Sequence, residues 1–256
     1  MTGKRMLIDT SKCQACKACQ VACQQWHSLE AEDTTFTGSY QNPPEMSGTN
    51  LTVVKFTEIE DAGKVKWLFF KDQCRHCESP PCVPSCPRHA IVKQANGMVR
   101  IDPDLCDPHA CAPGSGDSVP RPCQSACPYK NDGIRGIPKW KYTKEGALLG
   151  SKMRKCDFCF DRWKTKTGLK VPPFVSTEKL PNGQPVVTSA IPACQLTCPA
   201  GAITTGGAGK MLKSANSRVS YLKANGYPNA NIYPDQIQQI SHVIWILTED
   251  KSAYGL

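Results

Sequence analysis

Sixteen cysteines constrain this chain of 256 residues more than any other feature of its sequence. They fall into four sets of four, and no cysteine is left over. So many closely spaced thiols must be held by one another, by zinc or by an inorganic cluster. The sets are Cys13, Cys16, Cys19 and Cys23; Cys74, Cys77, Cys82 and Cys86; Cys106, Cys111, Cys123 and Cys127; and Cys156, Cys159, Cys194 and Cys198.

The spacing of the cysteines discriminates between these possibilities. Disulfides suit small secreted domains, whereas this chain is long and shows no apolar export signal before its first cysteine. Structural zinc favours pairs of C-x2-C motifs, but each set ends in C-x3-C. The first set has the C-x2-C-x2-C-x3-C spacing of bacterial ferredoxins, and proline follows C-x3-C in the other three. The pattern therefore predicts iron–sulfur clusters.

The net charge does not indicate nucleic-acid binding. A formal charge of +9 would by itself suggest acidic partners. Four cubane clusters held by thiolates would contribute about −2 each and bring the total to roughly +1. No Lys/Arg-rich run supports a nucleic-acid surface, and the most apolar run, Val243–Leu247, is too short to span a bilayer. We expect no nucleic-acid partner and no direct membrane span.

An internal repeat extends beyond the cysteines. LIDTSKC resembles RIDPDLC, and CPRHAIV resembles CPAGAIT. The repeat predicts an α+β fold of two bacterial-ferredoxin-like two-cluster modules, one inserted in the other. The expected parts are an outer module at 1–30 plus 150–205, a hairpin insertion at 31–71, an inner module at 72–135, a loop insertion at 160–193 and a C-terminal helix–strand tail at 206–256 for subunit docking.

Local sequence patterns predict several hairpins, helices and strands. Asn96-Gly97 between two apolar runs predicts a hairpin over 90–102. A second hairpin is expected over 51–70, a packing helix over 207–226 and a strand over 242–248. The helix is expected to present one apolar face made of Leu212, Ala215, Val219 and Leu222.

These features together resemble the iron–sulfur (beta) subunits of molybdopterin oxidoreductases, most closely those of formate dehydrogenases. The resemblance covers most of residues 5–205. The segments that carry it are CKACQVACQQW, TGSYQNPPEMS, TVVKFTEIE, WLFFKDQCRHCESPPC, ANGMVRID, KCDFCFDR and PACQLTCPAGAI. The third cysteine set departs from the usual pattern because its spacing, C-x4-C-x11-C-x3-C, is stretched.

The resemblance implies crossed ligation, in which a distant cysteine completes each [4Fe–4S] cluster. Four ligand groups result, here called sites 1 to 4. Site 1 is Cys13, Cys16, Cys19 and Cys198; site 2 is Cys74, Cys77, Cys82 and Cys127; site 3 is Cys86, Cys106, Cys111 and Cys123; site 4 is Cys23, Cys156, Cys159 and Cys194. Basic residues that flank these cysteines are interpreted first as solvated charges, and the alternative is that their charge raises the reduction potentials of the clusters. These residues are Lys12, Lys17, Arg75, Arg154 and Lys155.

The resemblance also implies a role and partners. The chain would have no catalytic site of its own. It would relay electrons from a molybdenum- or tungsten-pterin subunit that oxidises formate to carbon dioxide, towards a cytochrome, a membrane anchor subunit or another acceptor. Export to the periplasm with a partner is the expected location, and the cytoplasm is the alternative.

Other functions stay open at this point. The same cysteine pattern would suit the equivalent iron–sulfur subunit of a nitrate, polysulfide, dimethyl sulfoxide or arsenic-oxyanion reductase. A free-standing polyferredoxin and a structural zinc protein are further alternatives. Co-purifying subunits and metal analysis distinguish them.

Overall fold

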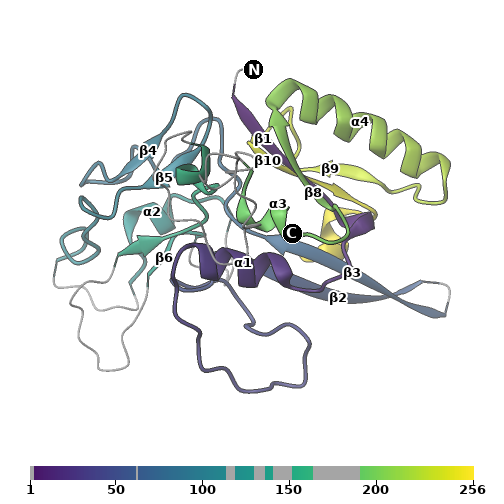
Figure 1. Ribbon diagram of the computed structural model, residues 1–256, viewed down its shortest axis with the longest axis horizontal. Coiled ribbons are helices and arrows are strands. Elements are labelled where there is room, and N and C mark those ends of the chain that lie inside the picture. Colours follow the sequence, from purple (N-terminus) through teal and green to yellow (C-terminus); the bar gives the residue numbers. More distant parts are fainter. Residues whose placement is uncertain (1–2, 62, 114–118, 130–135, 141–151, 164–190) are drawn as a thin grey trace, which may run out of the picture.

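The structure is a computed structural model that describes residues 3–61, 63–113, 119–129, 136–140, 152–163 and 191–256. Figure 1 shows a sheet covered by helix α4 on one side of the molecule, and short strands with helix α2 on the other. Among the described helices, none is long and apolar enough to cross a bilayer. Most of the expected loop insertion at 160–193, and the outer-module boundary at 150, lie outside the described residues.

A four-stranded sheet brings together segments from the two ends of the chain. Its order is β8-β1-β10-β9, and β1 runs parallel to β10 and antiparallel to β8. In the register of the central pair, Met6 lies opposite Val243. The strands are β1 (Lys4–Asp9), β8 (Ile203–Gly207), β9 (Asn231–Tyr233) and β10 (Val243–Leu247).

Both faces of this sheet are covered, and for that reason β10 is apolar throughout (VIWIL) and β1 is apolar at its centre (MLI). On one face, Leu7 and Ile244 pack with Ala215 of helix α4 (Ala208–Ala224). On the other face, Met6 and Trp245 pack against the hairpin formed by β2 (Val53–Asp61) and β3 (Lys64–Asp72). The sheet therefore forms the middle layer of the core.

The β2–β3 hairpin packs against one face of the sheet and closes that side of the core. Its strands pair antiparallel with Val53 opposite Asp72, which confirms the hairpin predicted over 51–70. The Phe70 ring stacks on Trp245 with their centroids 5.0 Å apart. The indole Nε1 of Trp245 donates a hydrogen bond to the carbonyl of Lys71 at 2.9 Å. The hairpin is thereby fixed to the sheet.

Short elements support the cysteine loops. The hairpin predicted around Asn96-Gly97 is confirmed, with β4 (Ile91–Lys93) paired to β5 (Val99–Ile101). Gly97 has a φ of +90°, and a side chain there would collide with the imidazole of His242. The other elements are η1 (Thr10–Lys12), α1 (Ala18–Trp26), α2 (Pro122–Ser125), β6 (Lys139–Trp140), β7 (Met153–Arg154), η2 (Phe160–Trp163), α3 (Ala193–Leu196) and η3 (Lys251–Tyr254).

The C-terminal segment completes this chain's own core. The predicted helix over 207–226 and strand over 242–248 are confirmed as α4 and β10. Of the two expected docking places for this strand, this chain or a partner, the structure shows the first: β10 lies between β1 and β9 with all five residues buried. Because its backbone is paired on both sides, it has no free edge for another subunit.

We expect Trp245→Ala to destabilise the fold by about 3–5 kcal/mol, because a fully buried aromatic side chain is lost from the centre of the core. The guanidinium unfolding midpoint measures this effect. Ile237→Ala is the control, since Ile237 is 91% exposed. An equal shift in both variants would contradict the central position of β10.

Candidate metal centres

The C-x2-C loops share an unusual backbone conformation. The residue before the second cysteine has a positive φ in three of them: Ala15 at +52°, His76 at +49° and Phe158 at +66°. None of the three is glycine, so each conformation costs about 1–3 kcal/mol. Left-handed residues within such loops turn successive backbone N–H groups toward an anion. The loops are therefore shaped to surround a negatively charged group.

The third cysteine set uses a side chain to shape its loop. The Asp107 carboxylate accepts hydrogen bonds from the backbone N–H groups of His109 at 3.0 Å and Ala110 at 3.1 Å. This turn compacts the four residues between Cys106 and Cys111, and both cysteines line one cavity. The stretched spacing is thus accommodated within the described part of the loop.

The cysteines expected at site 1 line a single cavity of about 400 Å³. Cys13 and Cys16 come from the loop after η1, Cys19 from the start of α1 and Cys198 from the segment after α3. The backbone N–H of Ala202 donates a hydrogen bond to Cys198 Sγ at 3.3 Å. Segments from opposite ends of the sequence thus meet here.

A second cavity, of about 280 Å³, contains the cysteines expected at site 4. Beside it, His27 Nε2 lies 2.9 Å from Asp157 Oδ1. The other ring nitrogen, Nδ1, lies 3.7 Å from Cys23 Sγ. The sequence pattern did not single out this histidine. The cysteines that line the cavity are Cys23, Cys156, Cys159 and Cys194.

Helix α1 lies between these two cavities. Cys19 and Cys23 are one helical turn apart. Cys19 nevertheless lines the site 1 cavity and Cys23 the site 4 cavity. A C-x3-C motif on a helix therefore divides its two sulfurs between neighbouring sites.

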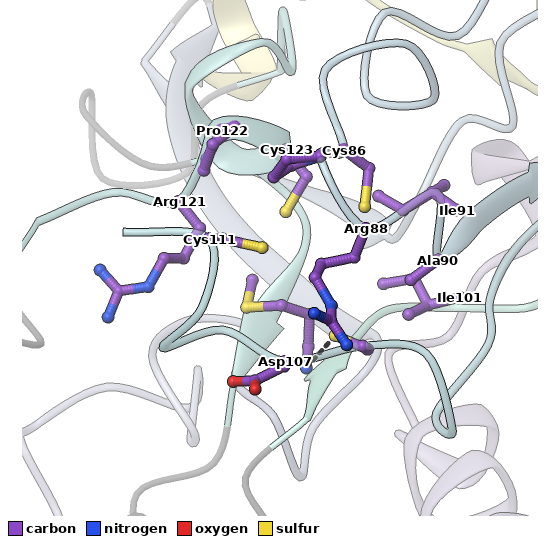
Figure 2. Close-up of a pocket in the computed structure, with 13 residues that line it drawn as sticks. Cys86, Arg88, Ala90, Ile91, Ile101, Asp107, Cys111, Arg121, Pro122 and Cys123 are labelled. Atoms are coloured by element: carbon purple, nitrogen blue, oxygen red, sulfur yellow. Dashed lines mark hydrogen bonds between the residues drawn. The ribbon is translucent and has the colours of Figure 1, made fainter. Parts of the chain in front are cut away.

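Figure 2 shows the cavity of about 320 Å³ that contains the cysteines expected at site 3. The sulfur atoms of Cys86, Cys111 and Cys123 point toward a common space. Cys106 lines the same cavity, and its Sγ accepts a hydrogen bond from the backbone N–H of Met153 at 3.4 Å. All four expected cysteines are therefore brought together.

The cysteines expected at site 2 also lie close to one another. Burial raises the pKa of Cys77 to about 12, and repulsion from the thiolates of Cys74, Cys127 and Cys82 adds to the rise. Cys74 packs against the apolar cluster that contains Cys127. The structure thus gathers these four sulfurs as well.

Electrostatic contacts between groups show which sites lie near one another. Burial raises the pKa of Cys19 to about 12, and Cys194 of site 4 contributes to the rise. Burial likewise raises the pKa of Cys156, with a contribution from Cys74 of site 2. Burial raises the pKa of Cys123 in site 3, and a site 2 cysteine contributes there too. These contributions indicate that site 4 lies near sites 1 and 2 and that site 2 lies near site 3.

These donor groups fit iron–sulfur clusters. All sixteen cysteines are free thiols. Burial raises the pKa of thiols such as Cys77 and Cys123, so four thiols of one group ionise together at neutral pH only with a cationic core bound among them. Backbone N–H groups directed at sulfur, such as that of Ala193 at 3.5 Å from Cys159 Sγ, further stabilise negative charge there.

Two flanking basic residues are less exposed than expected. Arg75 and Lys155 have exposed fractions of 3% and 5%, so their interpretation as solvated charges is wrong. Arg75 pairs with Asp72, whereas Lys155 donates a hydrogen bond to a backbone carbonyl at 3.0 Å. The sequence pattern places basic residues beside the cysteines, but packing decides whether water reaches them.

Lys71 is a functional candidate that the sequence pattern did not reveal. It is buried and lines both the site 1 and the site 4 cavities. Its only sequence signal is a lysine at the end of the apolar stretch WLFF, three residues before Cys74. Proximity to a cysteine in the chain could not distinguish it from other lysines.

The comparisons with known proteins agree with this geometry. Residues 65–177 match a family described as a 4Fe-4S dicluster domain. The chain is 36% identical over 242 residues to the iron–sulfur subunit of the nitrate-inducible formate dehydrogenase of Escherichia coli, covering 94% of this chain and 67% of that protein. It is 33% identical over 256 residues to the beta subunit of formate dehydrogenase 2 (cytochrome c-553) of Nitratidesulfovibrio vulgaris, covering 98% and 96%.

The chain belongs to the family of formate dehydrogenase iron–sulfur subunits. The resemblance seen in the sequence is thereby confirmed, as is a ferredoxin-like fold. The chain is a non-catalytic electron-transfer subunit of a formate dehydrogenase-type complex. A sulfite dehydrogenase subunit of Allochromatium vinosum is also related, at 31% identity over 207 residues, covering 79% of this chain and 68% of that protein.

We expect Ala15→Val to lose about four of the bound irons, because a β-branched side chain resists positive φ in the site 1 loop. Ala15→Gly should retain them. Iron analysis of anaerobically purified protein measures both. Gln25→Val, at an exposed position of α1 that does not line the site 1 cavity, is the control. Equal iron content in Ala15→Val and wild type would contradict a conformational requirement.

Proposed function

We propose that this chain holds four [4Fe–4S] clusters and relays electrons from a catalytic subunit that oxidises formate to carbon dioxide. Each cluster, when bound, carries one electron with little rearrangement. The ligands would be the cysteines of sites 1 to 4. The chain's own contribution is to fix the four sites in a row and to surround each with N–H donors and charges.

The arrangement of cysteines is the observation that supports this proposal most strongly. Each cysteine falls into one of four groups, and three of the groups line separate cavities. Adjacent groups in the row are close enough for their thiols to influence one another. Storage or structural metal sites need no such row, whereas electron transfer does.

The row also favours the nested arrangement of modules. Sites 1 and 4 use cysteines from the two ends of the cysteine pattern, and sites 2 and 3 use those of the middle. We assign the outer module to 1–30 plus 150–205 and the inner module to 72–135. The hairpin insertion at 31–71 then packs across the outer module.

The partners follow from the proposed reaction. Formate oxidation would be carried out by a molybdenum- or tungsten-pterin subunit, and a cytochrome or membrane anchor subunit would accept the electrons. The name of the Nitratidesulfovibrio relative includes cytochrome c-553, which supports a cytochrome as acceptor. A partner-dependent export would place the complex in the periplasm.

A sulfur oxyanion enzyme is the second candidate. The relation to the sulfite dehydrogenase subunit of Allochromatium supports it. The cysteine ligands of this chain would be the same in such an enzyme, and only the catalytic partner subunit would differ. The formate assignment is favoured because the formate dehydrogenase relatives match more of this chain at higher identity.

Reduction by substrate tests the proposed function. We expect formate to bleach the visible absorbance of the anaerobically purified complex, and the chain separated from its partner to show no response. About sixteen irons and sixteen sulfides per chain are expected. Zinc in place of iron, or reduction by sulfite but not by formate, would contradict the proposal.

Crossed ligation gives a separate prediction. Cys198→Ala should remove the site 1 cluster and leave that of Cys194 intact, because the two cysteines line different cavities. Cys194→Ala should do the reverse. Electron paramagnetic resonance of the reduced proteins distinguishes the two losses. Loss of the same signal in both variants would overturn the pairing.

A further inference from the structure

Lys71 occupies a position shared by two sites. Its side chain lines the site 1 cavity together with Cys19, and the site 4 cavity together with Cys194. It is only 2% exposed. Lys71 therefore places an ammonium group between two groups of cysteines.

No carboxylate neutralises this ammonium among the described residues. Its hydrogen-bond partner there is the side-chain amide oxygen of Gln73. The adjacent Asp72 pairs instead with Arg75 and with Lys55, whose Nζ lies 3.4 Å away. Side chains at successive strand positions point to opposite faces, so Asp72 faces away from Lys71. A buried cation without a counter-ion is costly, which implies a negative group nearby.

The nearest candidates for that negative charge are the cysteine sulfurs. Burial alone would lower the pKa of Lys71, but attraction to the thiolates of Cys194, Cys19, Cys156 and Cys23 outweighs burial and raises it. These cysteines belong to both sites. The charge balance of the region therefore links Lys71 to two clusters and not to one.

We propose that Lys71 is the shared counter-cation of the site 1 and site 4 clusters and that it raises the reduction potential of both. The inference rests on the proposed function. Reduction adds one negative charge to a cluster, and a buried positive charge beside it favours the reduced form. Because it lies beside both sites, Lys71 shifts both potentials in the same direction. Sites 2 and 3 lie farther along the row.

Redox titration of the full chain in its complex, followed by electron paramagnetic resonance, tests this role. In Lys71→Met we expect two of the four potentials to fall. Each reduction equilibrium constant should drop about tenfold, which corresponds to ~59 mV for a one-electron couple. Lys71→Arg should keep both potentials near their original values because it retains the charge.

Lys64→Met is the matched control. Lys64 lies at the exposed turn end of β3 and carries the same formal charge. Its loss should leave all four potentials unchanged. Unchanged potentials in Lys71→Met, a shift at one cluster alone, or an equal shift at all four would each overturn the inference.

If the Lys71→Met protein is too unstable for redox titration, its iron content tests the inference instead. If Lys71→Met loses about eight irons and Lys71→Arg keeps about sixteen, the charge is required by both clusters, which supports the inference. Loss of about four irons, or loss in both variants, would overturn it. Wild-type protein without iron would instead refute the proposed function.

Discussion

Thiolates repel one another when they are buried together, and they stay ionised at neutral pH only with a cation among them. The rest of this structure depends on that constraint. The chain buries groups of four cysteines, and backbone N–H groups donate hydrogen bonds to sulfurs of sites 1, 3 and 4. Three left-handed residues shape the C-x2-C loops, and the Asp107 carboxylate compacts the loop between Cys106 and Cys111. Strained backbone is retained because it encloses a charged group that water would otherwise solvate.

The four-stranded sheet and the β2–β3 hairpin bring separate cysteine loops together, so that the sites lie next to one another. Pairing of β1 with β8 and β10 brings the loop after β1 beside the segment before β8. Without this pairing, Cys198 could not share a cavity with Cys13. The β2–β3 hairpin covers the face of the sheet opposite α4, and its residue Lys71 lies between sites 1 and 4. The insertion is thus part of the electrostatic environment of the sites.

Helix α1 shows how a short motif can serve two sites. Its two cysteines lie one turn apart, and adjacent turns face different cavities. Electron transfer benefits from this arrangement because neighbouring sites share a rigid element. The same helix fixes the separation of sites 1 and 4, so the spacing between them depends on backbone geometry and not on flexible side chains.

The sequence by itself determined the chemistry and the local elements. Cysteine spacing predicts iron–sulfur ligands, Asn96-Gly97 predicts a turn, and apolar periodicity predicts α4, because each signal acts over a few residues. Only the tertiary structure decided the central position of β10, the burial of Arg75 and Lys155, and the place of Lys71 between two sites. These depend on contacts between segments far apart in the chain, and local patterns carry no information about which segments will meet.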